Sequence, residues 1–274
     1  MKIIPITNFG AAELEIYTQL NERQLKRLYE PAEGIFICES EKVIRRALNA
    51  GYEPISAFVQ DTCLPLIHTM IGQLDIPVYS APYDIMRSMT GYSLTGGILV
   101  AMKRKPLRRA EEIIRTCDHI VVLDDVENPT NVGAIFRSAA ALGADAVLLT
   151  EGCADPLYRR AARVSMGSVF QIQWTFSDRS LIRLLKENRY ETFALALSEN
   201  AADLSEVCDG ESKKGASKKV SSKKAVILGN EDHGISEEIL GECDHCVVIP
   251  MQNGVDSLNV AAASAVAFWE IFTS

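Results

Sequence analysis

From residue 120 onward, the sequence alternates between short aliphatic or β-branched runs and segments with helical periodicity. Strands and helices that alternate in this way are typical of an α/β domain with a mostly parallel sheet. The runs that predict strands are IVVLDDV, AVLLT, VFQIQW, TFALAL, AVILG and CVVIP. The helical segments between them include SLIRLLKEN and SEEIL, and a long helix ends the chain. This alternation constrains the fold of the chain more than any other feature.

The first hundred residues predict a separate, smaller α/β domain. Helices over about residues 11–29 and at EKVIRRALNAG mix with strands at GIFICE, PISAFV and GGILVAM. The polar, basic stretch after them predicts a connector. The predicted division is therefore a domain over residues 1–102, a linker over 103–117 and a second domain over 118–274. A chain of 274 residues, 47% of them hydrophobic, is long enough for two packed domains.

The sequence contains no pattern that is typical of a membrane or secreted protein. No apolar run reaches the roughly 18 residues that a membrane span needs, and the first residues lack the order of a secretory signal. The seven cysteines are odd in number and scattered, which argues against a disulfide framework and for reduced, mostly buried thiols. These features predict a cytoplasmic protein without a membrane partner.

One pair of cysteines, Cys243 and Cys246, is closely spaced. Because His245 lies between them and His233 is near, a metal site can be imagined. A structural zinc usually needs four ligands, and a second pair of cysteines is missing. We therefore predict no bound metal, and expect these thiols to pack at the start of a strand.

The formal net charge of −8 argues against a protein that covers nucleic acid without sequence preference, since such phosphate binding relies on Lys and Arg. Basic residues nevertheless cluster in residues 103–115, in YRRAAR (158–163) and in the lysine-rich segment DGESKKGASKKVSSKK (209–224). Such clusters are usually solvated faces, and contact with an anionic polymer is the alternative. The 209–224 segment has no apolar periodicity and predicts a surface loop, whose six lysines either contact an RNA backbone or solubilise the protein.

The segment DDVENPTNVGAIFRSAAALGADAVLL, residues 124–149, places two asparagines, a proline and a glycine between a strand and a helix. Apolar residues of that helix recur at helical spacing and predict the stripe that packs on the sheet: Val132, Ile135, Phe136, Ala139, Ala140 and Gly143. Arg137 lies about 120° from the centre of that stripe and so points off the core. One interpretation is that Asn131 caps the helix and Arg137 lies in solvent. The other is a ligand crevice, because the strand ends of an open parallel sheet face one.

Two further motifs lie near the end of the chain. In AVILGNEDHGIS, residues 225–236, a strand ends at Gly229, a turn follows, and Ser236 is expected to cap the next helix. In VVIPMQNGVDSLNVAAASAVAFWEIF, residues 247–272, Ser257, Leu258 and Asn259 open a helix that is apolar nearly all round. Such a helix is expected to be buried. Polar groups at its N-terminus either cap it, which is the simpler interpretation for Ser257, or contact a ligand.

In this order and at these spacings, the motifs NPTNVGAIFR, LGNEDHGIS and IPMQNGVDSLNVAAASA resemble the SpoU/TrmH family of RNA ribose 2'-O-methyltransferases, within the SPOUT class. The resemblance extends to GIFICESEKVIRRALNAG, which looks like the family's substrate-binding domain, related to ribosomal protein L30e. It implies an α/β fold in which a SPOUT domain with a deep trefoil knot follows a smaller L30e-like domain. It also implies a homodimer with the active site at the interface.

The resemblance implies a knot that holds S-adenosylmethionine, with walls made by Gly229, Ile249, Met251, Leu258 and Asn259. The substrate would be the ribose 2'-OH of an RNA, either rRNA or tRNA.

The same resemblance assigns the catalytic role to Arg137, and leaves Asn131, Glu231, Ser257 and Asn259 to position ribose, arginine and cofactor. Because a guanidinium stays protonated, with a pKa above about 12, we expect Arg137 to hold a phosphate and stabilise developing alkoxide charge. That phosphate or water would then assist loss of the proton.

Of three other classes of protein, one is disfavoured by the sequence, and two remain as alternatives. No G-x-G-x-x-G or P-loop pattern follows any predicted strand, which argues against a nucleotide-dependent oxidoreductase. A SPOUT-class base methyltransferase and a non-catalytic RNA-binding protein remain as alternatives. Two departures from the family pattern, the long 209–224 segment and Glu39-Ser40 where many relatives have Glu-Gly, leave the RNA target open.

Overall fold

The computed structural model of the chain describes residues 1–6, 12–29, 34–91, 94, 96–198, 201–207 and 223–273. The chain forms two compact units, Met1–Pro106 with Leu157–Phe170, and Leu107–Pro156 with Gln171–Ser274. Each has the predicted α/β class, and the second has the predicted mostly parallel sheet. The domain boundaries after residues 102 and 117 stay a prediction. Among the described residues, no helix combines the length and apolar character needed to cross a bilayer.

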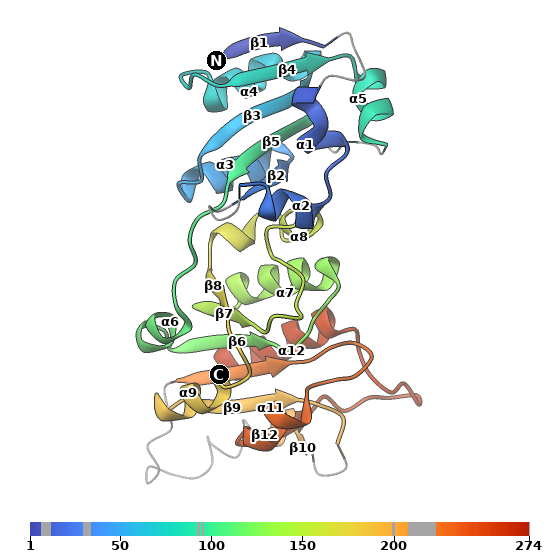
Figure 1. Cartoon of the computed structure of the whole chain (residues 1–274). Helices are drawn as coiled ribbons and strands as arrows, with labels where there is room; N and C mark the ends of the chain where they lie inside the picture. Colours follow the sequence, from blue (N-terminus) through green and yellow to red (C-terminus); the bar gives the residue numbers. More distant parts are fainter. Residues whose placement is uncertain are drawn as a thin grey trace. The chain divides into compact units, whose positions relative to one another are not determined.

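The first unit is built on a five-stranded mixed sheet with the order β1-β4-β3-β5-β2 (Figure 1). The strands β1, β4 and β3 are parallel, and β5 runs antiparallel to both of its neighbours. The strands are β1 (Lys2–Pro5), β2 (Ile35–Glu39), β3 (Pro54–Gln60), β4 (Pro77–Ala81) and β5 (Ile98–Lys103). The helices are η1 (Ala12–Leu14), α1 (Glu15–Thr18), α2 (Glu22–Arg27), α3 (Glu41–Asn49), η2 (Asp61–Cys63), α4 (Leu64–Ile71), α5 (Tyr83–Thr90), α8 (Arg159–Val164) and η3 (Ser168–Phe170).

The helix predicted over residues 11–29 is divided into short pieces. Asn21 accepts hydrogen bonds from the backbone N–H groups of Arg23 and Gln24, and the Gln24 side chain accepts one from the Asn21 N–H. This capping box begins a new helix at Glu22 and therefore ends any continuous one.

The basic cluster at residues 158–163 is partly neutralised within the first unit. The carboxylate of Glu39 is fully buried and lies 3.8 Å from Arg159 Nε and 3.4 Å from Arg163 Nη1. A buried carboxylate needs such partners. Two of the cluster's three arginines therefore serve this ion pair, while Arg160 is exposed.

The second unit is built on a seven-stranded sheet with the order β10-β12-β9-β11-β6-β7-β8, and all of its strand pairs are parallel. The strands are β6 (His119–Leu123), β7 (Ala146–Leu149), β8 (Gln173–Phe176), β9 (Glu191–Leu195), β10 (Ala202–Asp203), β11 (Lys224–Leu228) and β12 (His245–Val248). The helices are α6 (Ala110–Thr116), α7 (Pro129–Ala141), α9 (Leu181–Glu187), α11 (Glu237–Glu242) and α12 (Val260–Phe272).

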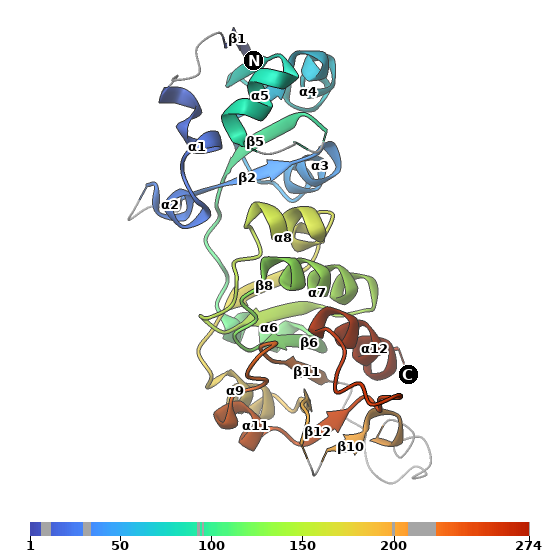
Figure 2. The same cartoon turned by 90° about the vertical axis from the view of Figure 1, so that its right-hand side faces the viewer.

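Helices cover both faces of this sheet (Figure 2). Buried side chains of α6, α9 and α11 form one core with the sheet, whereas α7 and α12 lie against each other on the opposite face.

Two predictions about this unit need correction. The stretch over residues 103–117, expected as a polar connector, contains α6, whose Ile113 and Ile114 are buried. The strand expected at VFQIQW begins only at Gln173, because Ser168–Phe170 forms the short helix η3.

Helix α7 begins at a different asparagine from the one predicted. Asn128 is the N-cap, and its side chain accepts a hydrogen bond from the Thr130 N–H at 2.9 Å. Pro129 follows at the first helical position, which suits its fixed φ and missing N–H. Asn131 is therefore not the cap, and its side chain is buried within the first turn.

We expect Asn128→Ala to lower the free energy of unfolding by about 1 kcal/mol, because it removes the acceptor that caps α7. Ser236→Ala is the matched control. Ser236 occupies the N-cap position of α11, but its side chain makes no capping hydrogen bond there, contrary to the prediction. Urea unfolding of both variants compares the two, and equal losses would contradict the assignment of Asn128.

Helix α12 is apolar nearly all round and is therefore predicted to be buried, but this prediction is wrong for one side of the helix. Its buried side chains include Ala267, Phe268 and Ile271, but Val266 is 43% exposed and Trp269 is 62% exposed. The reason is geometric: α7 and the sheet cover one side of the helix and leave the other uncovered.

The lysine-rich segment is described only at its end, so residues 209–222 and the predictions made for them lie outside the described residues. Lys224 begins β11, and its Nζ donates to the Ile271 carbonyl at 3.0 Å. Lys223 donates to the Ile114 carbonyl at 3.4 Å. These two lysines therefore make contacts within the chain, and contact of the segment with RNA stays a prediction.

Candidate active site

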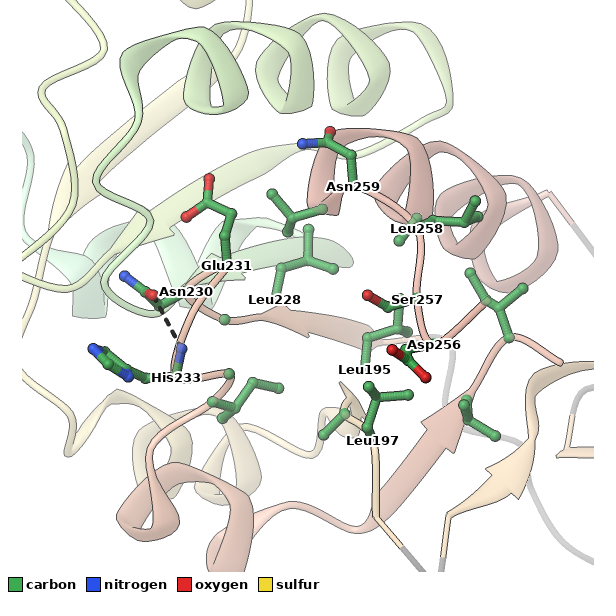
Figure 3. A pocket seen from close by; sticks show the side chains of 18 of the residues that line it. Leu195, Leu197, Leu228, Asn230, Glu231, His233, Asp256, Ser257, Leu258 and Asn259 are labelled. Carbon is green, nitrogen blue, oxygen red and sulfur yellow. Dashed lines mark hydrogen bonds between the residues drawn. The ribbon is translucent and has the colours of Figure 1, made fainter. Parts of the chain in front are cut away.

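A cavity of about 530 Å³ lies at the carboxyl ends of β9, β11 and β12. Figure 3 shows Leu195, Leu197 and Leu228 between the turn at Asn230–His233 and the segment from Asp256 to Asn259. Leu195 ends β9, Leu197 follows it, and Leu228 ends β11, so adjacent parallel strands supply the apolar wall. Ligand crevices of open α/β sheets are found at this edge.

The residues predicted to hold a cofactor are brought together by the fold. Each of them lines the cavity: Gly229, Ile249, Met251, Leu258 and Asn259. Of the residues predicted to act in catalysis, Glu231, Ser257 and Asn259 line it as well. Asn131 and Arg137 are not part of its lining. Ser257 is exposed and is not the cap of α12, because Asn259 occupies that position.

The turn after β11 is held tightly by backbone contacts. Asn230 and Gly234 exchange two backbone hydrogen bonds of 2.9 Å. The returning backbone passes so close to Gly229 that a Cβ there would lie 2.3 Å from the carbonyl carbon of Gly234. Gly234 has a φ of +72°, in the left-handed region that favours glycine. Both glycines are therefore required by the shape of this wall of the cavity.

Hydrogen bonds between side chains join the three sequence motifs. Asn131 accepts a hydrogen bond from Asn259 Nδ2 at 3.3 Å and donates to Glu231 Oε1. Asn259 also accepts from the Ala261 N–H at 3.0 Å and so caps α12. Because Asn131 is buried and uses both ends of its amide, it fixes the first turn of α7 against the other two motifs.

Arg137 lies in the middle of α7 and is exposed, as its place off the apolar stripe predicts. Its side chain makes no hydrogen bond or ion pair with any residue that the structure describes. Val132, Ile135 and Phe136 face the core. The guanidinium is therefore accessible to a bound ligand.

Several residues of the site were missed by the sequence interpretation. Asp256 and His233 line the cavity, and Leu195 and Leu228 form its wall. The signal for the leucines was their place at the ends of two strands that pair in the sheet. Asp124 was also missed, although an acidic residue directly after an apolar strand is a visible departure from the pattern.

The cysteines and histidines considered for a metal do not converge. Cys243 Sγ donates to the Ile239 carbonyl and Cys246 Sγ to the Ala196 carbonyl, while His245 Nε2 lies 2.8 Å from Glu191 Oε1. Burial raises the pKa of the Cys243 thiol to about 12, so it stays protonated near neutral pH. In the described parts of the chain, no group of three or more His, Cys, Asp or Glu residues is arranged to hold a metal ion.

Comparison with known proteins agrees with the three motifs. Residues 118–269 match the SpoU rRNA Methylase family. The chain belongs to this family. An uncharacterized tRNA/rRNA methyltransferase of Mycobacterium bovis is 32% identical over 259 residues, which are 94% of this chain and 87% of that protein. A 23S rRNA (guanosine-2'-O-)-methyltransferase of Acinetobacter baylyi is 27% identical over 77% of this chain and 84% of its own length.

Solved structures show the same fold over nearly the whole length of this SpoU family member. The AdoMet-bound rRNA methyltransferase of Sinorhizobium meliloti superposes with a TM-score of 0.78 at 21% identity, and covers 98% of this chain and 97% of its own. An RNA 2'-O ribose methyltransferase superposes with a TM-score of 0.73 at 24% identity and covers 97% of each chain. The predicted family and the predicted α/β fold class are therefore confirmed.

Proposed function

We propose that this SpoU family member is an S-adenosylmethionine-dependent RNA methyltransferase that acts on a ribose 2'-OH, with ribosomal RNA as the substrate and tRNA as the alternative. The observation that carries the proposal is the convergence of three separated motifs on one cavity. Its lining contains Gly229 and Glu231 of the second motif and Met251, Ser257 and Asn259 of the third, and Asn131 ties the first motif to them. Relatives named as 23S rRNA 2'-O-methyltransferases support the choice of ribose.

The cavity fits the chemistry of the cofactor. Its volume of about 530 Å³ lies within the range for small-molecule sites. Leu195, Leu228 and Leu258 offer apolar surface for a purine, while Asp256, Ser257 and the backbone of the 229–234 turn offer polar partners for a ribose and an amino-acid group. S-adenosylmethionine, when bound, supplies an activated methyl group on a sulfonium.

The chain's own residues would prepare the ribose hydroxyl as nucleophile. A neutral 2'-OH is a poor nucleophile, so it must lose or share its proton as the methyl group arrives. Arg137, exposed on α7, would hold a phosphate of the RNA and stabilise negative charge that develops on the oxygen. Asn131, Glu231 and Asn259 form a fixed network that positions the ribose and the turn around it. Water or the bound phosphate takes the proton.

A calorimetric titration with S-adenosylmethionine tests the cofactor. We expect one site per chain and no need for a metal ion or a nicotinamide. Tight binding of NAD, or methyl transfer that a chelator abolishes, would contradict the assignment.

Three further features of the family belong to this proposal. We infer that the end of the chain forms a deep trefoil knot around the cavity, and that the first unit is an L30e-like RNA-binding domain. We also infer that the protein acts in the cytoplasm. The six described cysteines are free, which agrees with a reducing compartment.

We propose that two copies of the chain form a homodimer through α12. Val266 and Trp269 lie three residues apart on the uncovered side of this helix, and Val255 and Leu258 before it are also exposed. Large apolar side chains exposed together on a surface mark an interaction site. Since Leu258 also lines the cavity, a partner at this surface would complete the site.

We expect Trp269→Arg to raise the dimer dissociation constant by about 30-fold or more, because a buried aromatic anchor contributes about 2 kcal/mol or more to an interface. Leu107→Arg is the control, since this exposed leucine precedes α6 on the other side of the sheet. Sedimentation equilibrium gives the dissociation constants. A monomeric wild-type protein, or a Trp269→Arg variant that stays fully dimeric, would contradict the proposed interface.

A further inference from the structure

Two consecutive acidic residues follow β6, and neither lines the cavity. Asp124 is 1% exposed, yet it carries a carboxylate. Its Oδ1 lies 3.3 Å from Arg179 Nε, and its Oδ2 accepts a hydrogen bond of 2.8 Å from the Ser236 N–H. An ionised group buried in this way is strongly destabilising unless both oxygens have partners.

Asp125 holds the other end of the same turn. Its carbonyl oxygen accepts a hydrogen bond of 2.8 Å from Asn230 Nδ2. Its side chain is fixed from two sides, by Thr150 Oγ1 at 2.7 Å and by Arg179 Nη2. The residue adopts a φ of +53°, so its backbone is held in a conformation that only a few residue types tolerate.

The two aspartates therefore anchor residues 230 and 236, which flank the cavity-lining residues 231–235. Arg179 is the group that contacts both carboxylates. It comes from the loop between β8 and α9, and its side chain is 36% exposed. Because it lies outside the cavity, it has no direct access to a ligand there.

We infer that Arg179 is a positioning residue: by neutralising Asp124 and Asp125 it fixes both ends of the 230–236 turn, and so holds the cofactor-binding wall in its binding shape. This role rests on the proposed function. Without the guanidinium, two adjacent carboxylates repel each other, and the buried one loses its counter-charge. The least costly relief is for Asp124 to release the Ser236 N–H and to turn toward water, which loosens the turn.

The test compares Arg179→Gln with Arg179→Lys and with the control Arg183→Gln. Arg183 lies four residues further along, in α9, and pairs with Glu242 on the surface at 2.9 Å. In Arg179→Gln we expect the Ser236 amide to exchange its hydrogen about tenfold faster or more, which is the effect of losing one charge-assisted hydrogen bond. Amides within β6 and β11 should keep their protection. Arg183→Gln should change neither set.

Kinetics give the second readout. The KM for S-adenosylmethionine should rise about tenfold in Arg179→Gln while kcat changes about threefold or less, because a loosened wall weakens binding before it affects the transferred group. Arg179→Lys should restore most of the affinity. Adding Asp125→Asn to Arg179→Gln should also recover part of it, since asparagine accepts a positive φ and removes one of the two charges.

Unchanged Ser236 exchange in Arg179→Gln, or the same changes in Arg183→Gln, would overturn the inference. A global loss of protection that includes β6 and β11 would overturn it as well, since Arg179 would then be a general stability residue. Hydrogen exchange of the cofactor-free protein does not depend on activity. If the wild type fails to bind S-adenosylmethionine, the proposed function fails, while the exchange result still decides whether Arg179 holds the turn.

Discussion

Arg137→Ala is expected to lose about 100-fold to 1000-fold in the rate of methyl transfer, the usual effect of removing a preorganised charge from a site where opposite charge develops. Its fold and cofactor affinity should stay intact. Arg137 is exposed, and its side chain makes no hydrogen bond or ion pair with the described residues, so truncation opens no cavity in the core. Such surface changes on a helix usually alter the free energy of unfolding by less than about 0.5 kcal/mol. Single-turnover transfer to the RNA substrate measures the effect.

Two variants sharpen this test. Arg137→Lys should recover little activity, because an ammonium group cannot make the planar, two-pronged contact of a guanidinium with phosphate and ribose oxygens. Arg115→Ala, which removes an exposed arginine from α6 on the opposite face of the sheet, should transfer methyl groups normally. Near-normal transfer by Arg137→Ala would move the catalytic role elsewhere. A collapse of its melting temperature would make Arg137 a structural residue.

The second large effect is expected for Gly229→Ala, which should abolish measurable cofactor binding and lower the free energy of unfolding by about 1–3 kcal/mol. The added Cβ would meet backbone atoms of Gly234 and Ile235 at 2.3 to 2.4 Å, and backbone cannot move aside as a flexible side chain can. The turn must therefore open. Calorimetric titration and urea unfolding measure the two quantities.

Gly241→Ala is the matched control for this change. A Cβ at Gly241, inside α11, would meet nothing within 4 Å. Because alanine favours a helix over glycine, the variant should gain about 0.5–1 kcal/mol and bind the cofactor normally. If Gly229→Ala bound the cofactor as well as Gly241→Ala does, the close approach at this turn would have no role in the site.

The parallel sheet and much of the cavity could be predicted because they depend on local patterns. Aliphatic runs between helical segments identify the strands, and the carboxyl ends of parallel strands meet at one edge. Gly229 follows β11, and Ile249 and Met251 follow β12, so their convergence follows from the order of elements. Their roles in binding the cofactor stay predictions.

Contacts between distant parts of the chain could not be predicted in this way. Pro129, which favours the first helical position, could have marked Asn128 as the cap. The contact of Asn131 with Glu231, 100 residues further along, has no such local signal. The partner of Asp124, Arg179, is 55 residues away and carries no motif. The exposed side of α12 could not be predicted either, because the apolar pattern of a helix does not show which of its sides the same chain covers.

The most direct test of ribose methylation uses purified protein, S-adenosylmethionine labelled in its methyl group, and ribosomal RNA from cells that lack the gene. Alkali cleaves RNA through the free 2'-OH, so a methylated ribose protects the bond that follows it. The account predicts label in alkali-resistant dinucleotides, and none with Arg137→Ala. Label in single nucleotides would instead show a base methyltransferase. RNA binding without any transfer of label would show a non-catalytic RNA-binding protein. Either result would contradict the central claim.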